Sequence, residues 1–203
     1  LDKLLAQQNY TDFVSAFQTP QKPTLTWNSA NLPWNQPSGN GSNIYQLGQE
    51  SASPTSNNGL SRDIVLNNQM LNNSSPILIT AAVIHETLHA YIGHNIALSE
   101  YNVINRYNDY GNWIGALDAF YSIKDLPANY SGHFQMLTDY FDKAVSILAQ
   151  WDNNEHTQKD YTMVMMYGLK TVDPNTPAGM KARIDSVYNL KMTSYNITQH
   201  GLD

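Results

Sequence analysis

The longest apolar run of the chain lies between Ile77 and Gly93, where hydrophobic residues fall on nearly every side of a helical projection. Such a segment is typical of a helix buried in a domain core. Ser75 followed by Pro76 marks its start, because serine caps helix N-termini and proline suits the first helical position. Gly93 is a natural C-terminal stop. The pattern therefore predicts one buried helix over residues 76–93.

Segments with strand character precede this helix and predict a small sheet on the N-terminal side, at Leu25–Trp27, Ile44–Leu47 and Arg62–Asn67. The Ser-, Pro- and Asn-rich segment Glu50–Asn58 predicts a flexible loop. The Arg62–Asn67 strand ends shortly before the buried helix. It is expected to be either an ordinary sheet strand or an edge strand beside the helix, where an extended peptide can pair with it.

Apolar residues at steps of three and four predict further helices on both sides of the buried one. One amphipathic helix is expected over residues 1–18. The others are expected at Ile96–Tyr107, Trp113–Tyr121, Ser131–Trp151, Glu155–Leu169 and Ala178–Leu190. The predicted fold class is therefore α+β, mainly helical, with a small N-terminal sheet beside the buried helix.

The centre of the buried helix reads His85-Glu86-Thr87-Leu88-His89, an HExxH pattern. Residues four apart on a helix share a face, so the two imidazoles can bind one Zn²⁺ ion. Glu86 lies beside them, and a carboxylate there can take a proton from water and pass it to a leaving amine. The alternative is a pair of structural core histidines, but burying two histidines and a glutamate without a metal is costly.

A catalytic zinc site also needs a third protein ligand and one position open to water. The chain offers several residues of the right chemistry after the motif: His94, Glu100, Asp109, His133 and His156. His94 is displaced by one residue from the third-ligand position of metzincins. Glu100 falls on the next predicted helix, as in gluzincins, and Asp109 lacks the Gly-Thr-x-Asp pattern of aspzincins. His133 begins the predicted helix Ser131–Trp151, from where it can reach a metal on a neighbouring helix.

The HETLHAYI core, the strand Ile64–Asn67 before it and a distant histidine on an amphipathic helix together resemble the SprT-like zinc metallopeptidases, most closely their bacterial and phage branch. The resemblance covers about residues 60–150. It implies a zincin-like domain in which His85, His89 and His133 bind Zn²⁺ and Glu86 is the catalytic base. Residues 1–58 are then an N-terminal extension, and residues 152–203 are C-terminal helices of the same single domain, 1–203.

Charge and composition narrow the functional classes. The chain is acidic, with a net charge of −6, which argues against a nucleic-acid footprint. It has no cysteine for a disulfide or a thiolate zinc site, and no apolar run that spans a membrane. The Asn-, Ser- and Thr-rich, Lys-poor composition favours a secreted or extracytoplasmic protein over a cytoplasmic one.

We therefore expect a monomeric zinc metallopeptidase that hydrolyses protein or peptide substrates. The alternative is a non-catalytic metal-binding or protein-interaction module that keeps the same fold.

Overall fold

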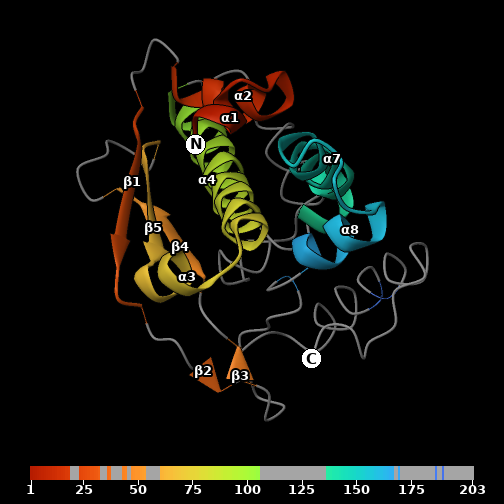
Figure 1. Ribbon diagram of the computed structural model, residues 1–203. Helices are drawn as coiled ribbons and strands as arrows, with labels where there is room; N and C mark the ends of the chain where they lie inside the picture. Colours follow the sequence, from red (N-terminus) through yellow and green to blue (C-terminus); the bar gives the residue numbers. More distant parts are fainter. Residues whose placement is uncertain are drawn as a thin grey trace.

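The computed structural model describes residues 1–18, 23–32, 36–37, 43–44, 47–53, 60–105, 136–166, 169, 186 and 189. These residues form an α+β fold that is mainly helical and has a small sheet, as predicted. The long helix α4 (Pro76–Asn105) runs between a three-stranded sheet on one side and α7 (Phe141–Trp151) and α8 (Gln158–Met166) on the other (Figure 1).

The three-stranded sheet has the order β1-β5-β4. Strand β5 (Arg62–Asn67) pairs parallel with β1 (Leu25–Ala30) and antiparallel with β4 (Gly48–Ala52), with Gly48 opposite Leu66. The predicted bounds of β5 are confirmed, and of the two expected roles the structure shows the ordinary sheet strand and not the edge strand. Both of its sides are hydrogen-bonded, so the edges among the described strands belong to β1 and β4.

Strand predictions before β5 are confirmed only in part. The strand expected from Leu25 is confirmed and extends to Ala30. The loop expected at Glu50–Asn58 is wrong for residues 50–52, which belong to β4, and residues 54–59 lie outside the described part. Strand β4 reads Gly-Gln-Glu-Ser-Ala, without a β-branched residue, so local propensity gives no strand signal there. A separate two-stranded pair consists of β2 (Gln36–Pro37) and β3 (Asn43–Ile44), and the latter overlaps the strand expected at Ile44–Leu47 by one residue.

Helix α4 starts where predicted, since the Ser75 hydroxyl oxygen accepts a 3.4 Å hydrogen bond from the Leu78 N–H. It does not stop at Gly93. The helix continues to Asn105, so the separate helix expected from Ile96 is its last part. A glycine inside a helix costs about 1 kcal/mol relative to alanine, and packing on both sides of α4 outweighs that cost.

Two buried faces explain why α4 is apolar nearly all round. One face packs against the helical part of the core through Ala81, Ile84, Leu88 and Ile92. The other packs against the sheet through Ala82 and Ala90, next to Ile64 and Leu66 of β5. The prediction of a helix buried through the core is therefore confirmed.

The remaining helices differ from prediction in their lengths. The N-terminal helix expected over residues 1–18 is divided into α1 (Asp2–Leu5), α2 (Gln8–Val14) and the 3₁₀ turn η1 (Ser15–Gln18). The short helix α3 (Asn68–Asn73) was not predicted. A π-helical turn, η3 (Met136–Tyr140), leads into α7.

Of the helix expected at Ser131–Trp151, only the part from residue 136 onward is described. The helix expected at Glu155–Leu169 is confirmed over Gln158–Met166, as α8. The helices expected at Trp113–Tyr121 and Ala178–Leu190 lie outside the described residues, apart from residues 186 and 189.

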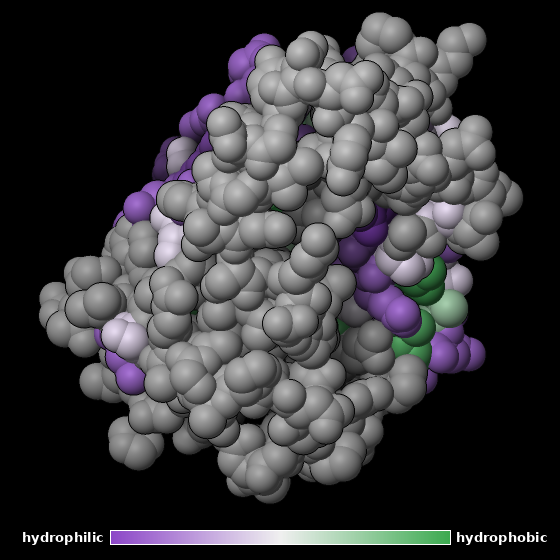
Figure 2. Space-filling model, turned by 180° about the vertical axis from the view of Figure 1, so that it is seen from behind, coloured by the Kyte–Doolittle hydropathy of each residue, from purple (hydrophilic) through white to green (hydrophobic). Residues whose placement is uncertain are grey.

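In the described part of the chain, no helix has the length and apolar character needed to cross a membrane. On the face shown in Figure 2, the coloured residues form mainly hydrophilic patches beside one small hydrophobic area.

Candidate metal centre

The two histidines of the HExxH motif bring one nitrogen each to the same place. Nε2 of His85 lies 3.1 Å from Nε2 of His89, and the ring centroids are 4.8 Å apart. In a tetrahedral zinc site with Zn–N distances of about 2.0–2.1 Å, two ligand nitrogens lie about 3.4 Å apart. The pair therefore fits a shared zinc ion with an adjustment of a few tenths of an ångström.

Helix geometry places this pair between the two buried faces of α4. At about 100° per residue, His85 and His89 fall between the stripe that packs on the helices and the stripe that packs on the sheet. Both side chains are half-buried, whereas their neighbours Ile84, Glu86 and Leu88 are buried. The two histidines thus lie at the border of the described core.

Across α4, a buried hydrogen bond fixes the rotation of the helix. The Tyr10 hydroxyl of α2 lies 2.9 Å from Oγ1 of Thr87, which also donates a 2.7 Å bond to the carbonyl oxygen of Val83. Burial of Tyr10 raises its pKa to about 12, so the hydroxyl stays protonated. Because Thr87 follows Glu86 directly, this contact also holds the motif in its orientation.

Glu86 faces the sheet and is only 6% exposed. A Cβ atom built on Gly48 of β4 would lie 2.8 Å from Cγ and 2.9 Å from Oε1 of Glu86, so strand and side chain are in close contact. Burial, and secondly the negative charge of Glu50, raise the pKa of Glu86 to about 8. A buried carboxyl group poised near neutral pH is suited to taking up and releasing a proton.

A buried ion pair, Arg62 with Glu50, lies on the same side of α4 as Glu86. Nη1 of Arg62 donates a 3.1 Å hydrogen bond to Oε1 of Glu50, and both side chains are more than 85% buried. The Arg62 guanidinium lies directly against Gly93, where a Cβ atom would come within 2.6 Å of it. Burial raises the pKa of Glu50, and the positive charge of Arg62 opposes that effect. The pair joins β4 and β5 to α4 next to the motif.

The expected third ligand cannot be placed in the described structure. His133 and Asp109 lie outside the described residues. Glu100 is excluded by the backbone, because α4 is unbroken and carries it about 16 Å along the helix axis beyond His89. Within the described part of the chain, no third histidine, cysteine, aspartate or glutamate completes a metal-binding group.

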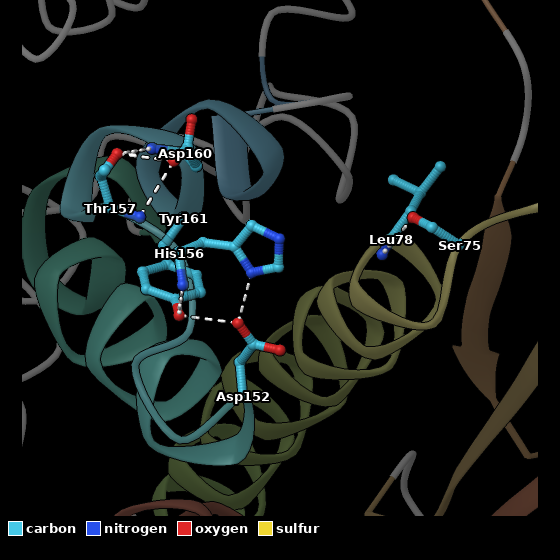
Figure 3. Close-up of polar contacts among 7 residues, drawn as sticks. All are labelled: Ser75, Leu78, Asp152, His156, Thr157, Asp160 and Tyr161. Carbon is cyan, nitrogen blue, oxygen red and sulfur yellow. Dashed lines mark hydrogen bonds and ion pairs between the residues drawn. The ribbon is translucent and has the colours of Figure 1, made fainter.

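The two other described histidines have structural partners. His94 is buried, lies on the far side of α4 from His85, and its Nδ1 is 2.8 Å from the carbonyl oxygen of Leu60. His156 follows α7, and its Nδ1 lies 2.6 Å from Oδ2 of Asp152 (Figure 3). Tyr161 donates a 2.7 Å bond to the same carboxylate, which ties α8 to the end of α7.

Gly48, Glu50 and Arg62 were not predicted as parts of the site. The sequence places Glu50 in the predicted loop Glu50–Asn58 and Arg62 at the start of the predicted strand Arg62–Asn67. The alternation of Gly48 and Glu50 is a possible signal, because residues two apart on a strand share one face. Their contact with α4 depends on strand register, which no local pattern specifies.

Comparison with protein-family models, curated proteins and solved structures found no significant match to this chain.

Proposed function

We propose that this protein is a zinc-dependent metallopeptidase of the HExxH type, with a zincin-like arrangement related to the SprT-like enzymes. The observation that carries the proposal is the convergence of the His85 and His89 Nε2 atoms to 3.1 Å, with the buried Glu86 on the adjoining face of the helix. The resemblance supports His133 as the third ligand.

The residues present fit zinc in both chemistry and spacing, since two imidazole nitrogens on successive turns are common zinc ligands. When bound there, zinc supplies a Lewis acid that polarises a carbonyl group and acidifies water. His85 and His89 hold and orient the ion. Glu86 accepts the proton of the attacking water and then donates it to the leaving amine.

The surroundings of Glu86 suit this task. Its carboxyl group is buried, and burial together with the negative charge of Glu50 sets its proton affinity. A cation bound at the two histidines favours the carboxylate form and lowers the pKa of Glu86 from about 8. The Glu86 carboxylate can then act as a base near neutral pH. It can hold the proton once negative charge nearby neutralises the positive charge of the cation.

Strand β4 supports a peptide as the substrate class. It is an edge among the described strands, and its first residue, Gly48, touches Glu86. A peptide that pairs with such an edge in extended form runs beside the glutamate that moves the proton.

The test is hydrolysis of a fluorogenic peptide library by wild-type protein and by Glu86→Gln, with zinc content measured on both. We expect the variant to keep about one zinc per chain and to lose hydrolysis by a factor of about 10³ or more. The exposed Glu155→Gln is the matched control and should remain active. Full activity in Glu86→Gln contradicts the mechanism. A wild-type protein that binds zinc but hydrolyses nothing favours the non-catalytic binding module.

A further inference from the structure

On the face of α4 that meets the sheet, the residues one turn before and one turn after Glu86 are small. Ala82 and Ala90 pack on β5, and Gly93 lies against Arg62. Glu86 falls on the same stripe, since these residues are spaced by three or four along the helix. Small side chains let a helix approach a sheet closely, so Glu86 needs a space on the sheet that its neighbours do not need.

That space is at Gly48. The three heavy atoms closest to a Cβ atom built there all belong to Glu86, at 2.8 Å (Cγ), 2.9 Å (Oε1) and 3.0 Å (Cδ). Side chains do not come this close to a real Cβ atom. The contact involves the middle and the end of the glutamate side chain, so an added methyl group would push the carboxyl group itself.

The backbone does not explain the glycine. Gly48 does not have a left-handed conformation, and it pairs with Leu66 as an ordinary residue of an antiparallel ladder. Glycine is unfavourable in strands, because it loses more conformational freedom on folding and has no side chain to pack. A glycine in a strand often marks close approach of another group, and here that group is Glu86.

We infer that Gly48 is a positioning residue: its missing side chain is what allows the Glu86 carboxyl group to occupy its place between α4 and β4. The inference rests on the proposed function for its catalytic meaning, but the contact itself can be tested without catalysis. Gly48 has no side chain to offer to the metal or to the substrate, and a peptide paired with β4 would meet only the backbone of this strand. It acts on the reaction only through the place that it leaves for Glu86.

The first experiment is a double-mutant cycle on thermal unfolding of the metal-free protein, with Gly48→Ala, Glu86→Ala and the double variant. In the wild-type background, Gly48→Ala should lower the Tm by several degrees, because the added methyl group overlaps the glutamate. In the Glu86→Ala background the same substitution should leave the Tm unchanged or raise it. If Gly48→Ala alone does not fold, its recovery in the Glu86→Ala background gives the same answer. An equal loss of Tm in both backgrounds, or failure to fold in both, overturns the inference.

The second experiment measures zinc content, kcat and KM for Gly48→Ala on a peptide that the wild type cleaves. Gly93→Ala is the matched control, because Gly93 lies at the same interface and faces Arg62 instead of Glu86. We expect Gly48→Ala to keep its zinc and its KM and to lose kcat about 10²-fold, the scale for a misplaced catalytic group. Gly93→Ala should keep kcat within a few-fold even if it is less stable.

These results separate the two proposals. Absence of hydrolysis in the wild type refutes the proposed function, whereas the unfolding cycle still decides whether Gly48 makes room for Glu86. Wild-type kcat in Gly48→Ala overturns the positioning role even if the cycle shows coupling.

Discussion

Replacing Glu86 by glutamine should change how the stability of the metal-free protein depends on pH. Burial, and secondly the charge of Glu50, raise the pKa of Glu86 from an ordinary value of 4.5 to about 8. The folded protein therefore binds a proton at Glu86 between these pH values, while the unfolded chain does not. By linkage, the stability from this group is fully present below pH 4.5 and is lost as the pH rises through about 8.

The size of this loss follows from the two pKa values. The difference between 8 and 4.5, at about 1.4 kcal/mol for each pH unit, corresponds to about 5 kcal/mol once the pH exceeds 8. At pH 7 the interval above 4.5 is 2.5 pH units, which gives about 3 kcal/mol. Both figures are a large fraction of the stability of an ordinary domain, about 5–15 kcal/mol. Glutamine cannot ionise, so Glu86→Gln lacks this loss.

The assay is urea unfolding, followed by circular dichroism, of wild type and Glu86→Gln in the presence of a metal chelator from pH 4.5 to pH 9. Groups that do not interact with Glu86 contribute equally to both proteins, so the comparison isolates Glu86 together with its coupling to Glu50. We expect the free energy of unfolding of the wild type to fall by several kcal/mol more than that of the variant. Saturating zinc should reduce the difference, because a nearby cation favours the carboxylate. The same pH dependence in both metal-free proteins would refute the reasoning.

Three further predictions concern the contacts around the site. Arg62→Met leaves Glu50 buried without its partner and should lower the free energy of unfolding by about 3–5 kcal/mol in urea titrations; a loss below 1 kcal/mol contradicts the buried pair. Tyr10→Phe removes one buried hydrogen bond and should cost about 1 kcal/mol by calorimetry, and an unchanged Tm speaks against that bond. The hydrogen bond to Asp152 raises the pKa of His156, so Asp152→Asn should lower that pKa in an NMR titration. The same contact lowers the pKa of Asp152, so stability from the pair is lost as the pH falls through the lowered pKa of Asp152 and as the pH rises through the raised pKa of His156. An unmoved titration means that the contact does not persist in solution.

Local signals predicted those elements that local interactions determine. Ser75 and Pro76 marked the start of α4, and the apolar, β-branched run of β5 gave its bounds. The helix end predicted at Gly93 is wrong, because α4 continues to Asn105. A glycine inside a helix costs about 1 kcal/mol, which is less than the packing on both faces of α4 supplies. The Arg62 guanidinium occupies the space that a side chain at Gly93 would fill, and this contact joins distant parts of the chain.

The candidate site divides in the same way. His85, Glu86 and His89 were predictable because one helical turn sets their spacing. Gly48 and Glu50 were not, because they reach Glu86 only through the pairing of β4 with β5 and the packing of that sheet on α4. Strand β4 has no β-branched residue to mark it, so neither its existence nor its register is visible in the sequence.

The most direct test of the central claim is the zinc content of purified protein, measured by mass spectrometry on wild type, His89→Ala and His133→Ala, with His94→Ala as the matched control. We predict about one zinc per chain in the wild type and in His94→Ala, and little or none in His89→Ala. Loss in His133→Ala as well would identify the third ligand. Zinc that is equal in all four proteins, or absent from the wild type even after reconstitution, would contradict a zinc centre at the HExxH motif.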